Sequence, residues 1–368
     1  MAQEQTGRSA IVAVPQGKKY AIATATSMGV RATPTEHRPM HLAERLNLQV
    51  TSAESNVVSI PASLGLPGIV LSKFVEGSPI STLIRSNLRS RGLEVEGPSV
   101  PQGGPWGYRH QFNLADTGYG ARGPRVHNDR AGEVGRTINL KDFDLDRILG
   151  DEGAQILHLS GLIAALSPEA GTFCLELARE AHKHGTLVSF DLNHRASFWE
   201  GRENELRSLF REIASLSDIL VGNEEDFQLC LGIEGPEPGG SEVAEKIDRF
   251  GEMIRRVQKE FPSVSVFATT LREVVHANLH RWGGILVSGE TRHVVEPREI
   301  PVYDRIGGGD GFVGGMLYGI LRGWPGEDCL HFGWATGALA VTGENDYAQP
   351  VDEEQVWSIW SGNARVQR

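Results

Sequence analysis

The chain has 368 residues, of which 40% are hydrophobic and 23% charged, the composition of an ordinary soluble protein with one large α/β domain or two smaller ones. Its net charge of −11 argues against a nucleic-acid-binding surface. Three cysteines without paired spacing argue against zinc and indicate reduced thiols in the cytoplasm, and no apolar run approaches the length of a membrane helix.

The first part of the chain mixes regular and irregular segments. Residues 1–16 lack the apolar core of a signal peptide, and we expect them to be disordered. The elements that follow are a strand (19–26), lid or loop material (31–50), a helix (53–64), a strand (69–74) and a helix (79–91). Pro61 should kink or shorten the first helix, while Ser78 is the expected N-cap of the second and Gly92 its stop.

Between residues 97 and 135 the composition changes to glycine, proline, aromatic residues and arginine. Short strands are predicted at 108–112 and 125–128, and the stretch is too long for an idle loop. We interpret it as a functional flap whose arginines suit an anionic substrate, although for any single arginine a solvated basic strip is the simpler reading. These arginines are Arg109, Arg122, Arg125 and Arg130.

The next part alternates strands and helices. Strands are predicted at 155–159, 187–190, 219–221 and 264–270, helices at 167–184, 203–215 and 240–260, and a hairpin at 284–287 and 293–295. Such alternation predicts a mostly parallel sheet with helices on both faces.

Residues 304–312 (DRIGGGDGF) predict a strand end, a three-glycine turn and the start of a helix whose apolar period becomes regular from Phe312. Backbone N–H groups can converge at such a turn without Cβ atoms in the way, and the helix N-terminus favours an anion. A carboxylate such as Asp310 would repel phosphate unless it accepts a proton from the attacking group. The pattern therefore indicates phosphoryl transfer to a hydroxyl, with a plain strand-to-helix connection capped by Asp310 as the alternative.

Polar side chains also follow two other predicted strands. The carboxyl ends of parallel strands share one edge of a sheet, where ligands bind. Arg195, after the strand 187–190, could clamp a carboxylate or phosphate, and Asn223 with Asp226 could hold hydrated magnesium. Alternatively, Asp191 and Asn193 only order a turn, and Asp226 belongs to the acidic first turn of a helix.

Other nucleotide-binding patterns are missing. The sequence contains no G-x-x-x-x-G-K-[ST], which excludes a P-loop kinase, and no G-x-G-x-x-G near its start, which argues against a dinucleotide fold.

With these residues in place, the chain resembles the ribokinase-like (PfkB) carbohydrate kinases, and within them the 2-keto-3-deoxygluconate kinases. The resemblance is carried by 304–312, 157–161 (LHLSG), 190–195 (FDLNHR) with Trp199, 268–273 (ATTLRE) and 126–132 (VHNDRAG). It implies a three-layer α/β/α sandwich over 17–368, with a mostly parallel central sheet. A small β-sheet lid would come from about 31–50 and 97–135.

The resemblance also implies roles for individual residues. Asp310 would be the catalytic base, and Gly307, Gly308 and Gly309 would form the anion hole. ATP would contact Asn223, Thr270, Arg272 and Gly309, and Mg²⁺ would be held through water by Asn223 and Asp226. The sugar or sugar acid would contact Arg195, Arg130, Tyr108, Asn128, Ser52, Asn56 and Asp346. Lids of this family often pair into dimers, so a homodimer in the cytoplasm is expected.

The chain departs from the family pattern at the sugar end. Where the family has Gly-Gly-Ala-Glu-x-Asn, residues 51–56 read TSAESN, and a tyrosine is usual at the position of Asn128. Phosphoryl transfer to 2-keto-3-deoxygluconate or a related acid is the main hypothesis. A kinase-fold sugar-binding or regulatory protein with little turnover, and a ribokinase- or fructokinase-type kinase for neutral sugars, are the alternatives.

Overall fold

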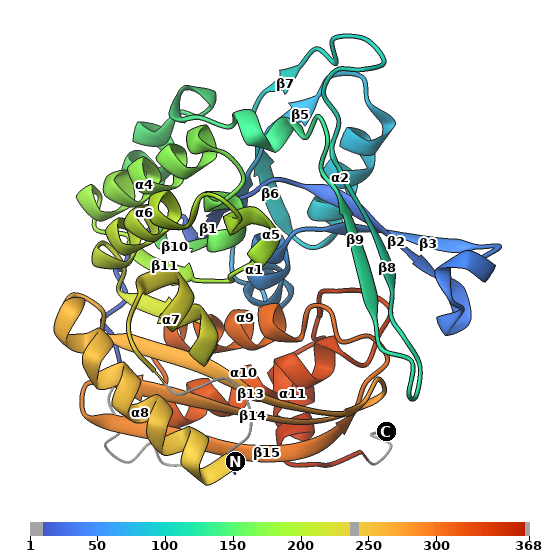
Figure 1. The fold of residues 1–368 in the computed structure, drawn as a ribbon. Coiled ribbons are helices and arrows are strands. Elements are labelled where there is room, and N and C mark those ends of the chain that lie inside the picture. Colours follow the sequence, from blue (N-terminus) through green and yellow to red (C-terminus); the bar gives the residue numbers. More distant parts are fainter. Residues whose placement is uncertain (1–9, 236–242, 365–368) are drawn as a thin grey trace.

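A nine-stranded sheet organises the chain, for which the computed structural model describes residues 10–235 and 243–364 (Figure 1). The strand order is β15-β14-β13-β12-β11-β10-β1-β4-β6. From β13 to β6 neighbouring strands pair in parallel, whereas β14 and β15 are added antiparallel. The strands are β1 (Tyr20–Ala25), β4 (Gly68–Leu71), β6 (Leu93–Glu96), β10 (Ala154–Ser160), β11 (Leu187–Asp191), β12 (Ile219–Val221), β13 (Val266–His276), β14 (Leu279–Ser288) and β15 (Thr291–Pro301).

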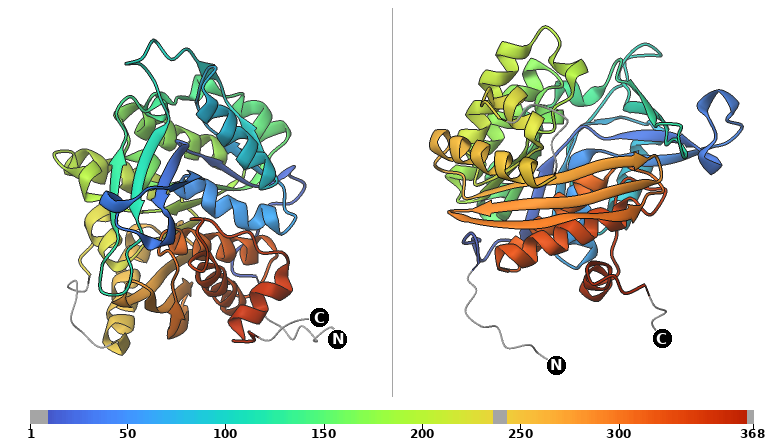
Figure 2. Two further views of the ribbon diagram at one scale, coloured as in Figure 1. Left: turned by 90° about the vertical axis from the view of Figure 1, so that its right-hand side faces the viewer. Right: turned by 60° about the horizontal axis from the view of Figure 1, so that its bottom comes forward.

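Helices cover both faces of this sheet because alternate residues of its strands point to opposite sides. In β10, Leu157 packs into the core with the helices α3, α4, α6, α7 and α8, and Ile156 into the core with α1, α2, α9, α10 and α11. The ribbon views show the helices on both faces (Figure 2). The helices are α1 (Ala53–Ser63), α2 (Pro79–Ser90), α3 (Gly161–Ala164), α4 (Pro168–Lys183), α5 (Ala196–Trp199), α6 (Glu203–Ser215), α7 (Glu224–Leu231), α8 (Val243–Glu260), α9 (Gly308–Leu321), α10 (Gly326–Ala340) and α11 (Glu353–Trp360).

A second, four-stranded sheet, here called the small sheet, has the order β3-β2-β8-β9. Its strands are β2 (Gly29–Pro34), β3 (Leu46–Thr51), β8 (Gln111–Asp116) and β9 (Arg125–Asp129). At its tip the backbone N–H of Gly120 donates to Asn278 Oδ1 (2.8 Å) and Ala277 N–H donates to Gly120 O (2.9 Å), so it reaches the connection between β13 and β14. Minor elements are β5 (Phe74–Val75) paired with β7 (Ser99–Val100), 3₁₀ turns at Thr35–His37, Met40–Leu42, Val134–Thr137 and Leu140–Asp142, and a π-helical turn at Asp146–Asp151.

The predicted fold class, an α/β/α sandwich with a small sheet, is confirmed, and most element bounds agree within a few residues. The segment 31–50, expected to be lid or loop material, contributes most of β2 and β3 to the small sheet. Two predictions need correction: the strand predicted at 69–74 divides into β4 and β5, and the strand predicted at 108–112 begins at Gln111. Of the helix predicted at 240–260, residues 240–242 lie outside the described part.

The proline in α1 does not shorten the helix, contrary to prediction. Pro61 lies in the last turn and the helix continues to Ser63. Its missing N–H would leave the Val57 carbonyl without its helical donor. Gly314 of α9 packs against that carbonyl, so closely that a Cβ at Gly314 would lie 2.5 Å from the oxygen. The proline therefore sits where α1 and α9 pack backbone against backbone.

The predicted disorder of residues 1–16 can be compared with the structure only from residue 10 onward. Residues 1–9 lie outside the described part, but from residue 10 onward the chain packs against the large sheet, because Ile11, Val12 and Val14 are half-buried there. Cys174, Cys230 and Cys329 are all buried, and burial raises the pKa of each thiol. Within residues 10–235 and 243–364, none of the helices has the length and apolar character to span a bilayer. The cytoplasmic location stays a prediction.

Candidate active site

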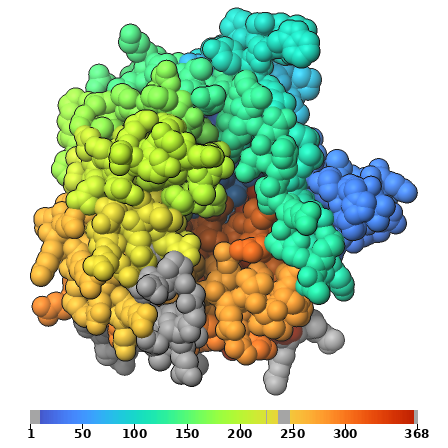
Figure 3. All heavy atoms as spheres, in the orientation of Figure 1, coloured from blue at the N-terminus to red at the C-terminus, as the bar shows by residue number. Residues whose placement is uncertain are grey.

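A cavity of about 470 Å³ lies at the carboxyl ends of the parallel strands, between the start of α9 and the small sheet. In the space-filling view it is the hollow between the yellow-green and teal surfaces, with orange-red atoms at its floor (Figure 3). It collects most residues predicted for the site from distant parts of the chain. These are Asn56, Asn128, Arg130, Arg195, Asn223, Asp226, Thr270, Arg272, Gly307, Gly309, Asp310 and Asp346.

The glycine turn differs in detail from the prediction, because only its first glycine is a turn residue. Gly307 is the N-cap of α9 with φ 87°, and a Cβ there would lie 1.9 Å from the Asp346 carbonyl oxygen. Gly308 and Gly309 already belong to the first helical turn. The first bond within the helix runs from Gly311 N–H to Gly307 O (2.8 Å), so the amides of residues 308–310 precede it. A Cβ at Gly309 would have no atom within 4 Å, which leaves this helix end open to the cavity.

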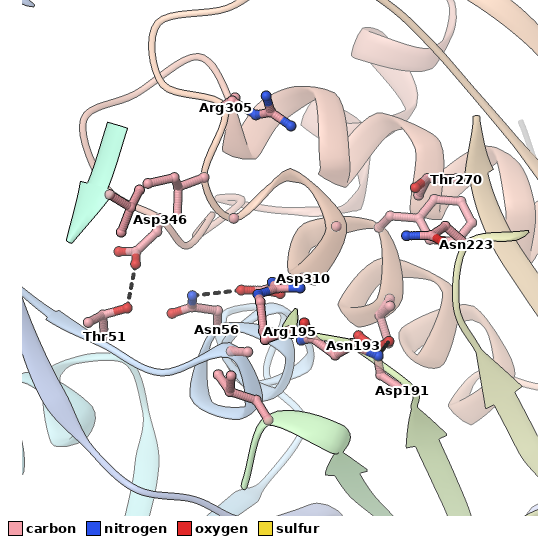
Figure 4. Close-up of a pocket in the computed structure, with 18 of the residues that line it drawn as sticks. Thr51, Asn56, Asp191, Asn193, Arg195, Asn223, Thr270, Arg305, Asp310 and Asp346 are labelled. Carbon is pink, nitrogen blue, oxygen red and sulfur yellow. Dashed lines mark hydrogen bonds between the residues drawn. The ribbon is translucent and has the colours of Figure 1, made fainter. Parts of the chain in front are cut away.

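Asp310 stands beside these amides and is half-buried. Its Oδ2 accepts a hydrogen bond from Asn56 Nδ2 (2.8 Å) (Figure 4). Burial raises the pKa of Asp310 to about 7, with Asp346 and Glu54 acting in the same direction and the Asn56 bond and Arg195 against it. A carboxyl group with a pKa near neutrality can accept a proton and release it again, which is what a general base requires.

Three arginines without a carboxylate partner line the cavity on the side of the glycine turn. Arg195, Arg272 and Arg305 make no ion pair with any described residue, in contrast to Arg31, Arg130, Arg147 and Arg202. Burial lowers the pKa of Arg272 to about 10, and repulsion from Arg305 and Arg195 adds to the effect. Clustered, unpaired guanidinium groups favour a polyanionic ligand such as a chain of phosphates.

Asn223 and Asp226 face the cavity but also hold the start of α7 together. Asn223 Oδ1 accepts from Asp226 N–H (2.9 Å) and Asp226 Oδ2 accepts from Asn223 N–H (2.9 Å), a reciprocal capping box. Asp226 Oδ1 accepts from His194 N–H (3.3 Å), and burial raises the pKa of Asp226 to about 6. Asp226 therefore does belong to the first turn of a helix, as the alternative interpretation predicted. A contact between Asn223 or Asp226 and hydrated magnesium stays a prediction. The described residues contain no cluster of three His, Cys, Asp or Glu side chains that could hold a metal.

Asp191 and Asn193 shape the turn that presents Arg195. Asn193 has a positive φ of 38°, and its N–H donates to Asp191 Oδ1 (3.2 Å). Burial, with the nearby Asp226 and Asp310, raises the pKa of Asp191. Both line the cavity, so ordering the turn and facing a ligand are compatible roles.

The opposite side of the cavity is neutral and rich in unused polar atoms. Asn56 Oδ1, Asn113 Oδ1 and Arg130 Nε are buried without a hydrogen-bond partner among the described residues. The charge of Arg130 is balanced by Glu133 (Nη1 to Oε1, 2.8 Å), and its guanidinium lies 5.1 Å from the Phe198 ring centre. Buried polar atoms rarely go unsatisfied, so these three indicate a ligand with several hydroxyl groups.

Three predicted site residues do not line the cavity. Ser52 is buried as the N-cap of α1, where its Oγ accepts from Ser55 N–H (3.1 Å). Gly308 packs against Val341, which a Cβ would approach to 2.8 Å. Tyr108 is 39% exposed and lies outside the cavity.

Four polar residues that line the cavity were not predicted as contacts: Arg31, Thr51, Asn113 and Arg305. Arg305 is part of the 304–312 motif, so its positive charge next to the glycine turn could have predicted a phosphate contact. Asn113 is the direct partner of Asn128 across β8 and β9, but that pairing can be known only once the register is.

Comparisons with known proteins agree with this geometry. The pfkB family carbohydrate kinase pattern matches residues 151–353. The 2-dehydro-3-deoxygalactonokinase of Haloferax volcanii is 28% identical over 344 residues, 92% of this chain and 96% of that protein. The 5-dehydro-2-deoxygluconokinase of Clostridium tetani is 28% identical over 229 residues, 61% of this chain and 60% of that protein.

A solved structure shows the same architecture. The crystal structure of 2-dehydro-3-deoxygluconokinase from Thermotoga maritima superimposes with a TM-score of 0.83 at 25% identity, covering 93% of this chain and 99% of that one. The family pattern spans more than half of the chain and includes the glycine motif with Asp310. The chain therefore belongs to the pfkB family of carbohydrate kinases and is an ATP-dependent carbohydrate kinase.

Proposed function

We propose that this kinase phosphorylates a hydroxyl group of a keto-deoxy sugar acid of the 2-dehydro-3-deoxygluconate type. One observation carries the proposal: Asp310 stands between a cationic, amide-lined end of the cavity and a neutral end with unsatisfied polar atoms. The cationic end suits the phosphates of ATP, and the neutral end suits a polyol. The named relatives all act on dehydro-deoxy sugar acids, which supports an acid as the acceptor.

Asp310 acts as the base in this reaction. The acceptor oxygen attacks the γ-phosphorus, its proton passes to an Asp310 carboxylate oxygen, and the bond from phosphorus to the bridging oxygen breaks, so that its electron pair leaves with ADP. The Asn56 hydrogen bond fixes the carboxylate in place. The amides of residues 308–310 stabilise charge on the transferred group.

The cationic end holds the nucleotide. Arg272 and Arg305 neutralise phosphate charge, with Asn223 and Thr270 as further contacts. Mg²⁺ bound to ATP supplies additional charge neutralisation, and the donors here fit a hydrated ion better than a protein cage, because both carboxylate oxygens of Asp226 already accept backbone N–H groups.

The neutral end holds the sugar acid. Asn56, Asn113 and Arg130 offer the unsatisfied atoms, and Asn128 lies beside them. Arg195 belongs to the cationic side of the cavity but lies near Asp310, where the two ends meet, and we assign its unpaired charge to the acceptor's carboxylate. The small sheet acts as the lid that excludes water from the closed site.

A homodimer through the small sheet completes the proposal. Leu46 and Leu48, on the outer strand β3, are 47% and 49% exposed, which favours burial against a second copy. Sedimentation equilibrium that finds a monomer at micromolar concentration would contradict it.

The decisive experiment measures ADP release with Mg²⁺, ATP and a panel of acceptors. Expected substrates are 2-dehydro-3-deoxygluconate, its galactonate epimer and 5-dehydro-2-deoxygluconate, with ribose and fructose as neutral comparisons. Asp310→Asn should lower kcat by about 10²–10⁴-fold while ATP binding survives, because only proton transfer is lost. Unchanged turnover by this variant would refute the role of Asp310.

Arg195→Ala separates acid from neutral acceptors. Losing a charge-assisted contact should raise KM for the acid about tenfold or more and leave ATP binding unchanged. Faster turnover of ribose or fructose than of every acid would favour the neutral-sugar kinase. Thermal stabilisation by a sugar without any ADP release would favour the binding protein.

A further inference from the structure

Arg31 is a charged residue buried where the small sheet meets the glycine turn. It lies in the middle of β2 and is only 2% exposed. Its Nη1 lies 2.8 Å from Asp304 Oδ2, and its Nε lies 3.9 Å from Asp346 Oδ2. Both acids are also buried, at 1% exposure each. A charge this deep is retained only when it is paired, so the three groups depend on one another.

The two acids flank the turn that forms the anion hole. Asp304 Oδ1 accepts from Ile306 N–H (3.0 Å), one residue before Gly307. The backbone carbonyl of Asp346 packs against Gly307, leaving no room for a Cβ. The Asp346 carboxylate also accepts from Thr51 Oγ1 of β3 (Figure 4). Whatever fixes these two carboxylates therefore fixes the backbone of the turn.

The third guanidinium nitrogen of Arg31, Nη2, connects the small sheet with the segment that carries Asp346. Its Nη2 donates to Gln49 Oε1 (2.9 Å) and to the Glu344 carbonyl (3.1 Å). The strand registers pair Arg31 with Gln49 on β3 and with Asn113 on β8, and Asn113 with Asn128 on β9. Directly paired residues share a face of a sheet, so one polar row crosses all four strands. Its Asn113 and Asn128 end faces the cavity.

From this geometry we propose that Arg31 is a positioning residue that locks the glycine turn and the polar row of the small sheet into one arrangement. The phosphate end and the sugar end of the cavity are thereby set at a fixed separation, with Asp310 between them. The guanidinium is needed because its three nitrogens face three different partners, Asp304 from Nη1, Asp346 from Nε and Gln49 from Nη2, which a lysine ammonium cannot reproduce. The consequence for turnover rests on the proposed function.

The experiment compares Arg31→Gln and Arg31→Lys with a matched control, Arg45→Gln. Arg45 belongs to the same β2–β3 hairpin, but its side chain is 75% exposed and pairs with Glu36 (3.4 Å), whose side chain is 62% exposed. We expect both Arg31 variants to lose at least about tenfold in kcat and the control to stay within about twofold. Adding guanidinium to Arg31→Ala should restore part of the lost kcat, which a general loss of stability would not allow.

Hydrogen–deuterium exchange provides a readout that needs no substrate. Peptides covering residues 304–309 should exchange at least about fivefold faster in Arg31→Gln and be unchanged in Arg45→Gln. If the wild type phosphorylates no sugar acid, the proposed function fails while the exchange comparison still tests Arg31. Wild-type kcat, or unchanged exchange at 304–309, in Arg31→Gln overturns the inference.

A second variant covers the case in which Arg31→Gln does not fold. Arg31→Gln with Asp304→Asn removes both charges of the shorter pair and leaves no isolated charge between them. We expect this double variant to fold, with the same lowered kcat and fast exchange at 304–309. A folded double variant with wild-type kcat would overturn the inference equally.

Discussion

Asp310 reduces the stability of the folded protein when it is ionised, and it also gives the site its proposed general base. Burial raises its pKa to about 7, and the Asn56 bond and Arg195 prevent a larger rise. In the unfolded chain the same group has its ordinary pKa of 3.8. The folded protein therefore binds this proton more tightly than the unfolded chain does, a condition that links the chemistry of the site to stability.

The pH dependence of turnover follows from this value. Asp310 works as a base only when ionised, so kcat/KM should rise about tenfold per pH unit below about 7 and level off above it. A profile measured with saturating ATP tests this. A plateau that continues down to about pH 5 would mean that a group other than Asp310 accepts the proton.

The same pKa has a consequence for stability. Ionising Asp310 costs stability as pH rises from about 4 to 7, because the folded state must release a proton that it holds more tightly. Asp310→Asn should therefore melt at a higher temperature than the wild type at about pH 8 and at a similar one near pH 4.

At the scale of elements, α9 has neighbouring glycines with opposite constraints. Gly307 has a left-handed backbone and touches the Asp346 carbonyl, whereas Gly309 faces open cavity. Gly307→Ala should lose at least about 2 kcal/mol of stability from backbone strain and overlap. Gly309→Ala should fold like the wild type but bind ATP at least about tenfold more weakly, because its methyl group occupies the phosphate site. Melting curves and ATP titrations of the two variants check the contrast.

The bounds of the helices and strands also show how much of the fold could be predicted from the sequence. Segments with a clear period and clear ends, such as 203–215 and 219–221, were predicted to the residue. The clusters at Asp191 and Asn223 were correctly placed at one edge, because parallel strands share that edge.

The failures have a common cause in contacts between distant segments. Pro61 was expected to kink or shorten its helix because the packing of Gly314 on the freed carbonyl cannot be seen in the sequence. Arg31 was missed because a lone arginine in a polar segment looks exposed until the strand register places it between Asp304 and Asp346. Ser52 and Tyr108 do not line the cavity, and their predicted contacts with the sugar stay predictions.

At the scale of the whole molecule, the small sheet is held at both ends. Its β2–β3 side is fixed by Arg31 and Thr51, and its β8–β9 tip meets the β13–β14 connection through Asn278 (2.8 Å to Gly120 N–H). The first attachment is buried and ionic. The second is a pair of partly exposed hydrogen bonds, so opening should begin at the tip.

Loosening the tip should therefore affect binding more than chemistry. Asn278→Ala removes the acceptor for Gly120 N–H and should raise KM for the sugar acid about threefold to tenfold with little change in kcat. Proteolysis in the 117–124 turn should also become faster, and bound substrates should restore protection. An unchanged KM together with faster proteolysis would show that closure of this tip does not contribute to substrate binding.

The buried thiols offer a way to observe that motion directly. Every cysteine of the chain is enclosed and poorly ionised, so the natural protein should react slowly with maleimides. A single cysteine placed at Tyr119, which is 63% exposed at the tip, would then be the one site that takes a fluorescent dye. The enzyme can thus carry a fluorescent reporter for opening and closing of the tip without prior replacement of its natural cysteines.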